Sequence, residues 1–225
     1  MAATVIDGLV PSTLWKKFYE ISQVPRPSKS EERIRLYLRN FAGQNYLSMK
    51  EDEAGNIVIQ IPPKPGFEKS PTVVLQSHVD MVCEKNKDTD HDFMNDPIVL
   101  IRDGEWIKAD GTTLGADNGI GAAAALAVAC DDDFEHGPLE LLFTVDEETG
   151  LTGVNYLKKG FISGSTLLNL DTEEDGAFYV GCAGGMDTVG TYKIELEQII
   201  DGYQPFAIAI SGLLGGHSGI NIADV

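Results

Sequence analysis

Three short runs of apolar residues in this chain each end in a residue type that binds metal ions. The runs are residues 72–77, 139–145 and 166–170, and they continue into His78, Asp146 and Asp171. Short leucine-rich and β-branched runs bounded by polar turns are typical of buried strands in a mostly parallel sheet. Open α/β sheets bind ligands in the crevice beyond the carboxyl ends of their strands. We therefore predict an α/β fold with a mixed, mostly parallel sheet flanked by helices.

The residues that follow these runs have the types that a metal centre requires. Residues two apart on a strand face the same side, so Asp80 can orient His78 through a ring N–H. Glu147 and Glu148 follow the second run. They form an acidic turn before Gly150 in one interpretation; in the other, one acid binds metal and the other takes a proton from metal-bound water. Asp171 follows the third run directly. Several acids gathered in one crevice repel each other unless a cation joins them.

A glycine-rich turn, residues 115–121, precedes the alanine-rich segment 122–130. Asp117 in this turn is a helix cap in one interpretation and a carboxylate bridging two metal ions in the other. The sequence GIGAAA also fits the GxGxxA pattern of a nucleotide-binding module. That pattern is weak here, because no convincing strand precedes it and Asp117 would repel a pyrophosphate.

Composition excludes several classes of partner. The net charge of −18 and a pI near 4.4 would repel phosphate backbones and anionic lipids, so we expect no nucleic acid and no membrane partner. The longest apolar stretch, residues 120–130, is far shorter than the ~20 residues of a membrane span, and no signal peptide is visible. Three widely spaced cysteines favour a reducing, cytoplasmic location and small buried apolar roles: Cys83, Cys130 and Cys182.

Other elements are predicted from periodicity and turn residues. We expect helices over residues 12–21 (capped by Ser12 or Thr13), 28–41 (with a capping box from Ser28 to Glu31) and 150–159. We expect strands over residues 56–61 and 106–109, and an antiparallel hairpin from residues 188–195 and 206–210. The change of pattern near residue 186 predicts two domains, residues 1–185 and 186–225.

The remaining histidines differ in their surroundings. His91 and His136 lie in charged loops, where we expect surface residues. His217 lies between glycines in the sequence GGHSG, which is typical of a simple loop but also permits close approach of a ligand.

Taken together, the motifs resemble the aminoacyl-histidine (Xaa-His) dipeptidases, bacterial members of the co-catalytic di-zinc exopeptidases. The resemblance spans residues 25–220, and the order and spacing of the motifs make it specific. The matching strings are SHVDMVCEKN, DGEWIKADGTTLGADNGIG, HGPLELLFTVDEETG, LNLDTEEDG, YVGCAGG and GLLGGHSG.

This resemblance implies a set of metal ligands. His78 and Asp171 would bind one Zn2+, Glu148 would bind a second, and Asp117 would bridge them. Oxygen and imidazole ligands also accept Mn2+ or Co2+.

The resemblance also implies catalytic roles. Asp80 would orient His78, and Glu147 would be the general base and later the proton donor to the leaving amine. His217 would be the histidine of an α+β lid domain, polarising the substrate carbonyl, often across a homodimer.

The sequence departs from the family pattern at its end. In the family, the second zinc takes a histidine from near the C-terminus, after the lid, and no candidate for it precedes Val225. We expect a truncated chain or a fragment with low activity. In it, the zinc site of His78, Asp117 and Asp171 could be occupied, while the site of Asp117 and Glu148 would be weak.

The function implied is metal-dependent hydrolysis of dipeptides, preferentially Xaa-His and including β-alanyl-histidine. A sibling amidohydrolase acting on N-acyl amino acids is the nearer alternative. An inactive metal-binding or interaction protein is the alternative from another class.

Overall fold

A computed structural model of the chain describes residues 5–172, 174, 176–181, 188–199 and 201–210. The chain separates into two compact units, residues 1–180 and 181–225. All helices and strands described below belong to the first unit.

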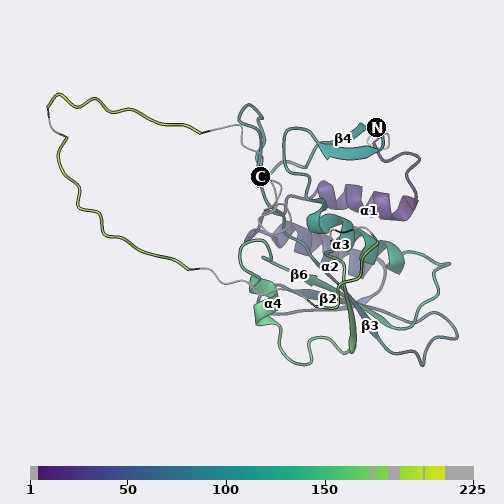
Figure 1. The fold of residues 1–225 in the computed structure, drawn as a ribbon. Coiled ribbons are helices and arrows are strands. Elements are labelled where there is room, and N and C mark those ends of the chain that lie inside the picture. Colours follow the sequence, from purple (N-terminus) through teal and green to yellow (C-terminus); the bar gives the residue numbers. More distant parts are fainter. Residues whose placement is uncertain (1–4, 173, 175, 182–187, 200, 211–225) are drawn as a thin grey trace. The chain divides into compact units, whose positions relative to one another are not determined.

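The first unit contains a five-stranded mixed sheet with the strand order β1-β2-β6-β3-β7. β3 pairs in parallel with β6 and with β7, whereas β2 is antiparallel to β1 and β6. The three apolar runs are therefore neighbours, with the His78 strand in the middle (Figure 1). This confirms the predicted α/β class and the adjacency of the three strands. The strands are β1 (Ser48–Glu51), β2 (Ile57–Ile61), β3 (Val73–His78), β6 (Leu139–Thr144) and β7 (Thr166–Asn169).

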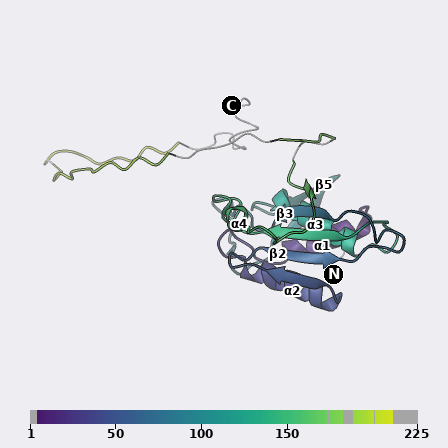
Figure 2. The same cartoon turned by 90° about the horizontal axis from the view of Figure 1, so that it is seen from below.

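Three helices cover one face of the sheet: α1 (Ser12–Ser22), α2 (Glu32–Gln44) and α3 (Ala116–Ala129). Phe18, Leu38 and Leu126 from these helices pack with Ile59 and Leu141 from the strands in the main core. Figure 2 shows α2 beside β2, which it contacts. The alanines of α3 allow this helix to lie close to β3. Among the described residues, no helix has the length and hydrophobicity needed to cross a bilayer.

The opposite face of the sheet has a smaller core. Val58, Val74 and Leu142 pack there against apolar side chains between residues 157 and 162. α4 (Thr152–Tyr156) precedes that segment. A separate antiparallel hairpin of β4 (Leu100–Asp103) and β5 (Trp106–Ala109) confirms the strand predicted over residues 106–109.

Both predicted helix caps are wrong. α1 begins at Ser12, with Pro11 in the N-cap position and no side-chain cap hydrogen bond. α2 begins at Glu32 and not at residue 28, because Lys29 has a left-handed backbone with φ of 67°. The Glu31 carboxylate instead accepts N–H groups of Lys29 (2.8 Å) and Asp146 (3.1 Å), so it joins a turn to the end of β6.

Two other elements differ from prediction. α4 has five residues, because Leu151 takes a left-handed conformation and the chain leaves the helix after Tyr156. The predicted hairpin is not formed in the described part of its range, since residues 188–199 and 201–210 contain no strand. A two-stranded ribbon on its own buries too little apolar surface to be stable, and Ile194 and Leu196 of this segment are exposed.

Candidate metal centre

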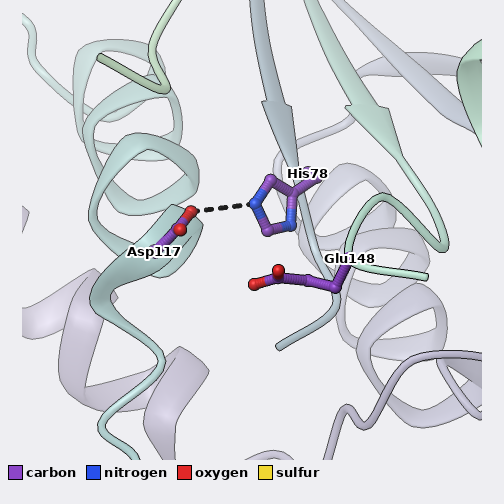
Figure 3. A group of neighbouring side chains, drawn as sticks. All are labelled: His78, Asp117 and Glu148. Carbon is purple, nitrogen blue, oxygen red and sulfur yellow. Dashed lines mark hydrogen bonds and ion pairs between the residues drawn. The ribbon is translucent and has the colours of Figure 1, made fainter. Parts of the chain in front are cut away.

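His78 occupies the carboxyl end of the central strand β3 and is buried. Its Nδ1 lies 3.2 Å from Oδ1 of Asp80, two residues later on the chain. A carboxylate on one ring nitrogen fixes the orientation of an imidazole and leaves the other nitrogen for a ligand. Nε2 of His78 therefore faces a group of acids, two of which are drawn in Figure 3.

The acids around Nε2 come from three distant parts of the chain. Oδ1 of Asp117, in α3, lies 2.9 Å from Nε2, and Oδ1 of Asp171, after β7, lies 3.7 Å away. Oε2 of Glu147, in the turn after β6, lies 4.0 Å away. Glu148 belongs to the same group, since ligand atoms of His78, Asp117 and Glu148 all lie within 4.8 Å of one another. The five residues predicted from separate motifs thus meet at one place.

Asp117 points toward His78 because the first turn of α3 is irregular. Gly115 has a positive φ of 67°, and Asp117 and Asn118 have non-helical backbone angles. Gly115 occupies the N-cap position, and no side chain makes a cap hydrogen bond there. The helix-cap interpretation of Asp117 is therefore wrong. Its carboxylate instead faces the imidazole (Figure 3).

Asp80 connects the strand end of β3 to the turn after β6. Its Oδ1 accepts the N–H of Glu147 (3.1 Å), and its Oδ2 accepts the N–H of Glu148 (3.2 Å) and the hydroxyl of Ser28 (2.8 Å). Burial raises the pKa of Asp80, but hydrogen bonds from His78, Glu147 and Ser28 outweigh it and lower that pKa to about 2. The ionised carboxylate of Asp80 thus holds the backbone N–H groups of both consecutive glutamates beside His78.

Without a cation, the carboxylates around His78 repel one another, and burial and this repulsion raise the pKa of two of them. Burial, and then the charge of Asp117, raise the pKa of Asp171 to about 6 against the opposing effect of His78. Burial and the charge of Asp117 also raise the pKa of Glu148. The amide of Asn118 donates a short hydrogen bond to Asp171. A divalent cation would favour the ionised form of each carboxylate.

The donor set fits a zinc-type ion. Two ligands at about 2.0–2.1 Å from a tetrahedral Zn2+ lie about 3.4 Å apart, and the Nε2 distances to Asp117 and Asp171 bracket this value. One imidazole nitrogen with carboxylate oxygens suits Zn2+, Mn2+ or Co2+. The residues present therefore fit a divalent metal ion of this kind, as the family resemblance implies.

A second acidic group is satisfied by hydrogen bonds. Glu31, Asp80 and Asp146 are buried within 4.8 Å of one another. Asp146 accepts the hydroxyls of Thr149 (2.5 Å) and Thr152, and it has a positive φ of 49°. Asp146, the first acid after its apolar run, thus belongs to the turn and not to the His78 group.

Other residues with predicted roles differ from expectation in several cases. His136 is buried, donates its Nδ1–H to the Gly137 carbonyl (2.7 Å) and stacks on Phe134, so its prediction as a surface residue is wrong. His91 is partly buried beside Phe93. Cys130 is exposed and Cys83 is partly buried, contrary to the buried roles predicted. His217 and Cys182 lie outside the described residues.

Sequence reasoning missed three residues that support the site. Asn118 follows Asp117 directly and reaches Asp171, a role that adjacency to an acid in a glycine-rich turn could have signalled. Ser28 has the sequence position of a helix cap, whereas its hydroxyl donates to Asp80. Arg26 is buried and binds carbonyl groups on both sides of the crevice, which no local pattern indicates.

The metal-free protein should lose stability as pH rises through neutrality. Burial lowers the pKa of His78, but hydrogen bonds to Asp117 and Asp80 raise it overall to about 10. A raised pKa stabilises the fold below the unfolded value near 6.5, and this stabilisation is lost as pH climbs toward 10. Above about pH 6.5 the slope should rise toward its limit of about 1.4 kcal/mol per pH unit. Thermal unfolding in chelator should show it, and His78→Gln should flatten the slope while His91→Gln keeps it. An equal slope in the His78→Gln variant would contradict the assignment.

The known proteins to which the chain is similar include several peptidases. The chain is 46% identical to the cytosol non-specific dipeptidase of Escherichia coli (strain K12) over 214 aligned residues. The alignment covers 95% of this chain and 44% of that protein. The crystal structure of aminoacylhistidine dipeptidase from Vibrio alginolyticus has 47% identity and a TM-score of 0.75, covering 78% of this chain and 36% of that one. A tripeptidase structure from Staphylococcus aureus subsp. aureus Mu50 has 27% identity and a TM-score of 0.61, covering 72% and 44%.

The chain spans less than half the length of each of these proteins. The predicted likeness to the aminoacyl-histidine dipeptidases is confirmed by the Vibrio structure. Residues 74–214, well over half of the chain, match the family described as peptidase family M20/M25/M40, and the chain belongs to that family.

Proposed function

We propose that these residues form the metal-binding part of a dipeptidase active site, and that the protein hydrolyses dipeptides, Xaa-His dipeptides among them. The observation that carries the proposal is the group around His78 Nε2. Oxygens of Asp117, Asp171 and Glu147 lie 2.9, 3.7 and 4.0 Å from this nitrogen. Family membership and the dipeptidase relatives support hydrolysis as its chemistry.

In this proposal, His78 and Asp171 would hold one Zn2+, Glu148 would hold a second, and Asp117 would contribute to both sites. A bound divalent ion lowers the pKa of a coordinated water to about 7 and polarises the substrate carbonyl. Asp80 fixes the ring of His78 through Nδ1, so that Nε2 stays directed at Asp117. The partial exposure of Asp117 and Glu147 leaves this side of the crevice accessible to substrate.

Glu147 is proposed as the general base. Its Oε2 lies 4.0 Å from His78 Nε2, and its N–H is held by Asp80. From this position Glu147 would accept a proton from the attacking water at a carboxylate oxygen and then transfer it to the nitrogen of the leaving amine. Asp80 cannot share this role, because its oxygens already accept hydrogen bonds and its pKa is about 2.

The finer assignments rest on the relatives and on the sequence. The Vibrio relative is named for aminoacyl-histidine substrates and the Escherichia coli relative for broad dipeptide substrates, so we propose that histidine at the second position is preferred but not required. The cytosolic relative supports a cytoplasmic location. Residues 186–225 are proposed to begin a lid domain in which His217 contacts the substrate and through which a homodimer forms.

The test is a comparison of substrate classes on the full product of the reading frame that encodes this chain, loaded with Zn2+. We expect hydrolysis of alanyl-histidine and β-alanyl-histidine, slower hydrolysis of dipeptides without histidine, and negligible hydrolysis of N-acetyl amino acids. Chelator should abolish all activity, because the acids around His78 then lack their cation. Faster hydrolysis of N-acetyl amino acids would favour the sibling amidohydrolase. Zinc binding without any hydrolysis would favour an inactive metal-binding protein.

A further inference from the structure

A buried arginine joins the two segments that carry His78 and Asp117. Arg26 is 2% exposed and lies in the connection between α1 and α2. Its Nη1 donates to the carbonyls of Val79 (3.0 Å) and Asp80 (2.8 Å), directly after His78. Its Nη2 donates a short hydrogen bond to the carbonyl of Gly115, two residues before Asp117. One guanidinium group therefore joins the segment after His78 to the segment before Asp117.

The surroundings of Arg26 are shaped to admit this group. A Cβ atom added at Gly115 would lie 2.5 Å from Arg26 Nη2, and one added at Gly119 would lie 2.7 Å from the same atom. Both glycines belong to the start of α3, which carries Asp117. The neighbouring residues continue the attachment, since Pro27 forms a bridge with Met81 and Ser28 donates to Asp80.

Fold stability alone gives little reason for this arrangement. Burying a cationic group costs free energy, and apolar replacements of buried charges are often neutral or stabilising. The Nε–H of Arg26 is buried without a hydrogen-bond partner among the described residues, which adds to that cost. Burial lowers the pKa of Arg26 to about 10, with Asp80 the largest opposing influence, so the group is still charged at neutral pH.

We propose that Arg26 is a positioning residue that sets the separation between His78 and Asp117 and thereby the affinity of the metal centre. The inference rests on the proposed metal site. A planar guanidinium can direct separate N–H groups at carbonyls on two segments, whereas a lysine ammonium acts as a single point. Without the guanidinium, the Gly115 carbonyl and the segment after β3 lose their common partner.

The sign of the effect separates positioning from simple electrostatics. Removing a positive charge beside a cation site should strengthen cation binding if charge alone matters. If Arg26 positions the ligands, its removal should weaken binding despite the more negative surroundings. Arg26→Lys keeps the charge, so electrostatics predicts little change for that variant and positioning predicts a loss.

The experiment titrates Zn2+ into the metal-free 225-residue chain in competition with a chromophoric chelator. We expect Arg26→Met and Arg26→Lys to weaken zinc binding by about 10- to 100-fold, the range found for residues that orient metal ligands. Arg39→Met is the matched control, because Arg39 lies on α2 and pairs with Glu32 and Glu51, away from the crevice. It should bind zinc as the parent chain does.

A second variant keeps Arg26 and changes only the space that its guanidinium group occupies. Gly119→Ala adds one methyl group against Arg26 Nη2 at a position with ordinary helical backbone, and it should also weaken zinc binding. Co2+ in place of zinc should show a changed visible spectrum in Arg26→Lys and Gly119→Ala, which a loss of stability alone would not produce. Circular dichroism identifies any variant that fails to fold, and the folded variants then decide the question.

The outcomes distinguish the two proposals. No zinc binding by the parent chain would overturn the metal site and this inference with it. Zinc binding by the parent chain with equal or tighter binding by folded Arg26→Met or Arg26→Lys would overturn the role of Arg26 alone.

Discussion

Replacing Glu147 by glutamine is expected to lower the rate of dipeptide hydrolysis by about 10²- to 10⁴-fold, the usual contribution of a general acid–base residue. Glutamine keeps the size of the side chain and the N–H that Asp80 accepts, but it cannot take a proton from water. Zinc binding should therefore be retained while turnover is lost. The measurement is kcat for alanyl-histidine on the zinc-loaded full gene product, together with its zinc content.

Glu53→Gln is the matched control for this change. Glu53 is exposed and pairs with Lys158, outside the crevice. It should hydrolyse the dipeptide at the parent rate. Turnover by Glu147→Gln at the parent rate would show that Glu147 is not the general base, and Glu148 would then be the next candidate for that role.

Replacing Asp117 by asparagine should reduce zinc affinity beyond the roughly 10- to 100-fold cost of losing a residue that only orients a ligand. Asp117 is the acid closest to His78 Nε2, and in the proposed site its carboxylate serves both ions. A neutral amide offers a weaker oxygen ligand and removes one negative charge from the crevice. Chelator competition on the 225-residue chain measures the change.

Asp110→Asn provides the control, because Asp110 is an exposed aspartate that precedes the same helix. Its zinc affinity should match that of the parent chain. An Asp117→Asn variant that binds zinc as tightly as Asp110→Asn would show that Asp117 is not a ligand.

The centre of the fold could be predicted from sequence because its signals are local and agree with each other. The runs that became β3, β6 and β7 are apolar and end in His78, the Asp146 turn and Asp171. Parallel strands align their carboxyl ends, so adjacency alone brings these residues together. Helix α3 was equally clear from its alanines, although the direction of Asp117 depended on a kink that composition does not reveal.

The errors arose where a distant partner replaced a local one. The motif from Ser28 to Glu31 has the pattern of a capping box, but Ser28 binds Asp80 and Glu31 binds the N–H of Asp146. His136 has charged neighbours in sequence, yet it is buried beside Phe134. Arg26 lies between two prolines, which indicates a loop. The local sequence does not predict its hydrogen bonds to carbonyls more than 50 residues away. Each of these contacts is settled by tertiary packing.

The double pairing of β3 has a consequence for how length changes act on this chain. A strand that slips by one residue turns every side chain to the other face, which would carry the imidazole away from the acids. β3 is hydrogen-bonded to β6 on one edge and to β7 on the other, so two independent ladders oppose such a slip. We therefore expect changes in the length of the proline-rich connection of residues 62–71 to leave the register of β3 unchanged.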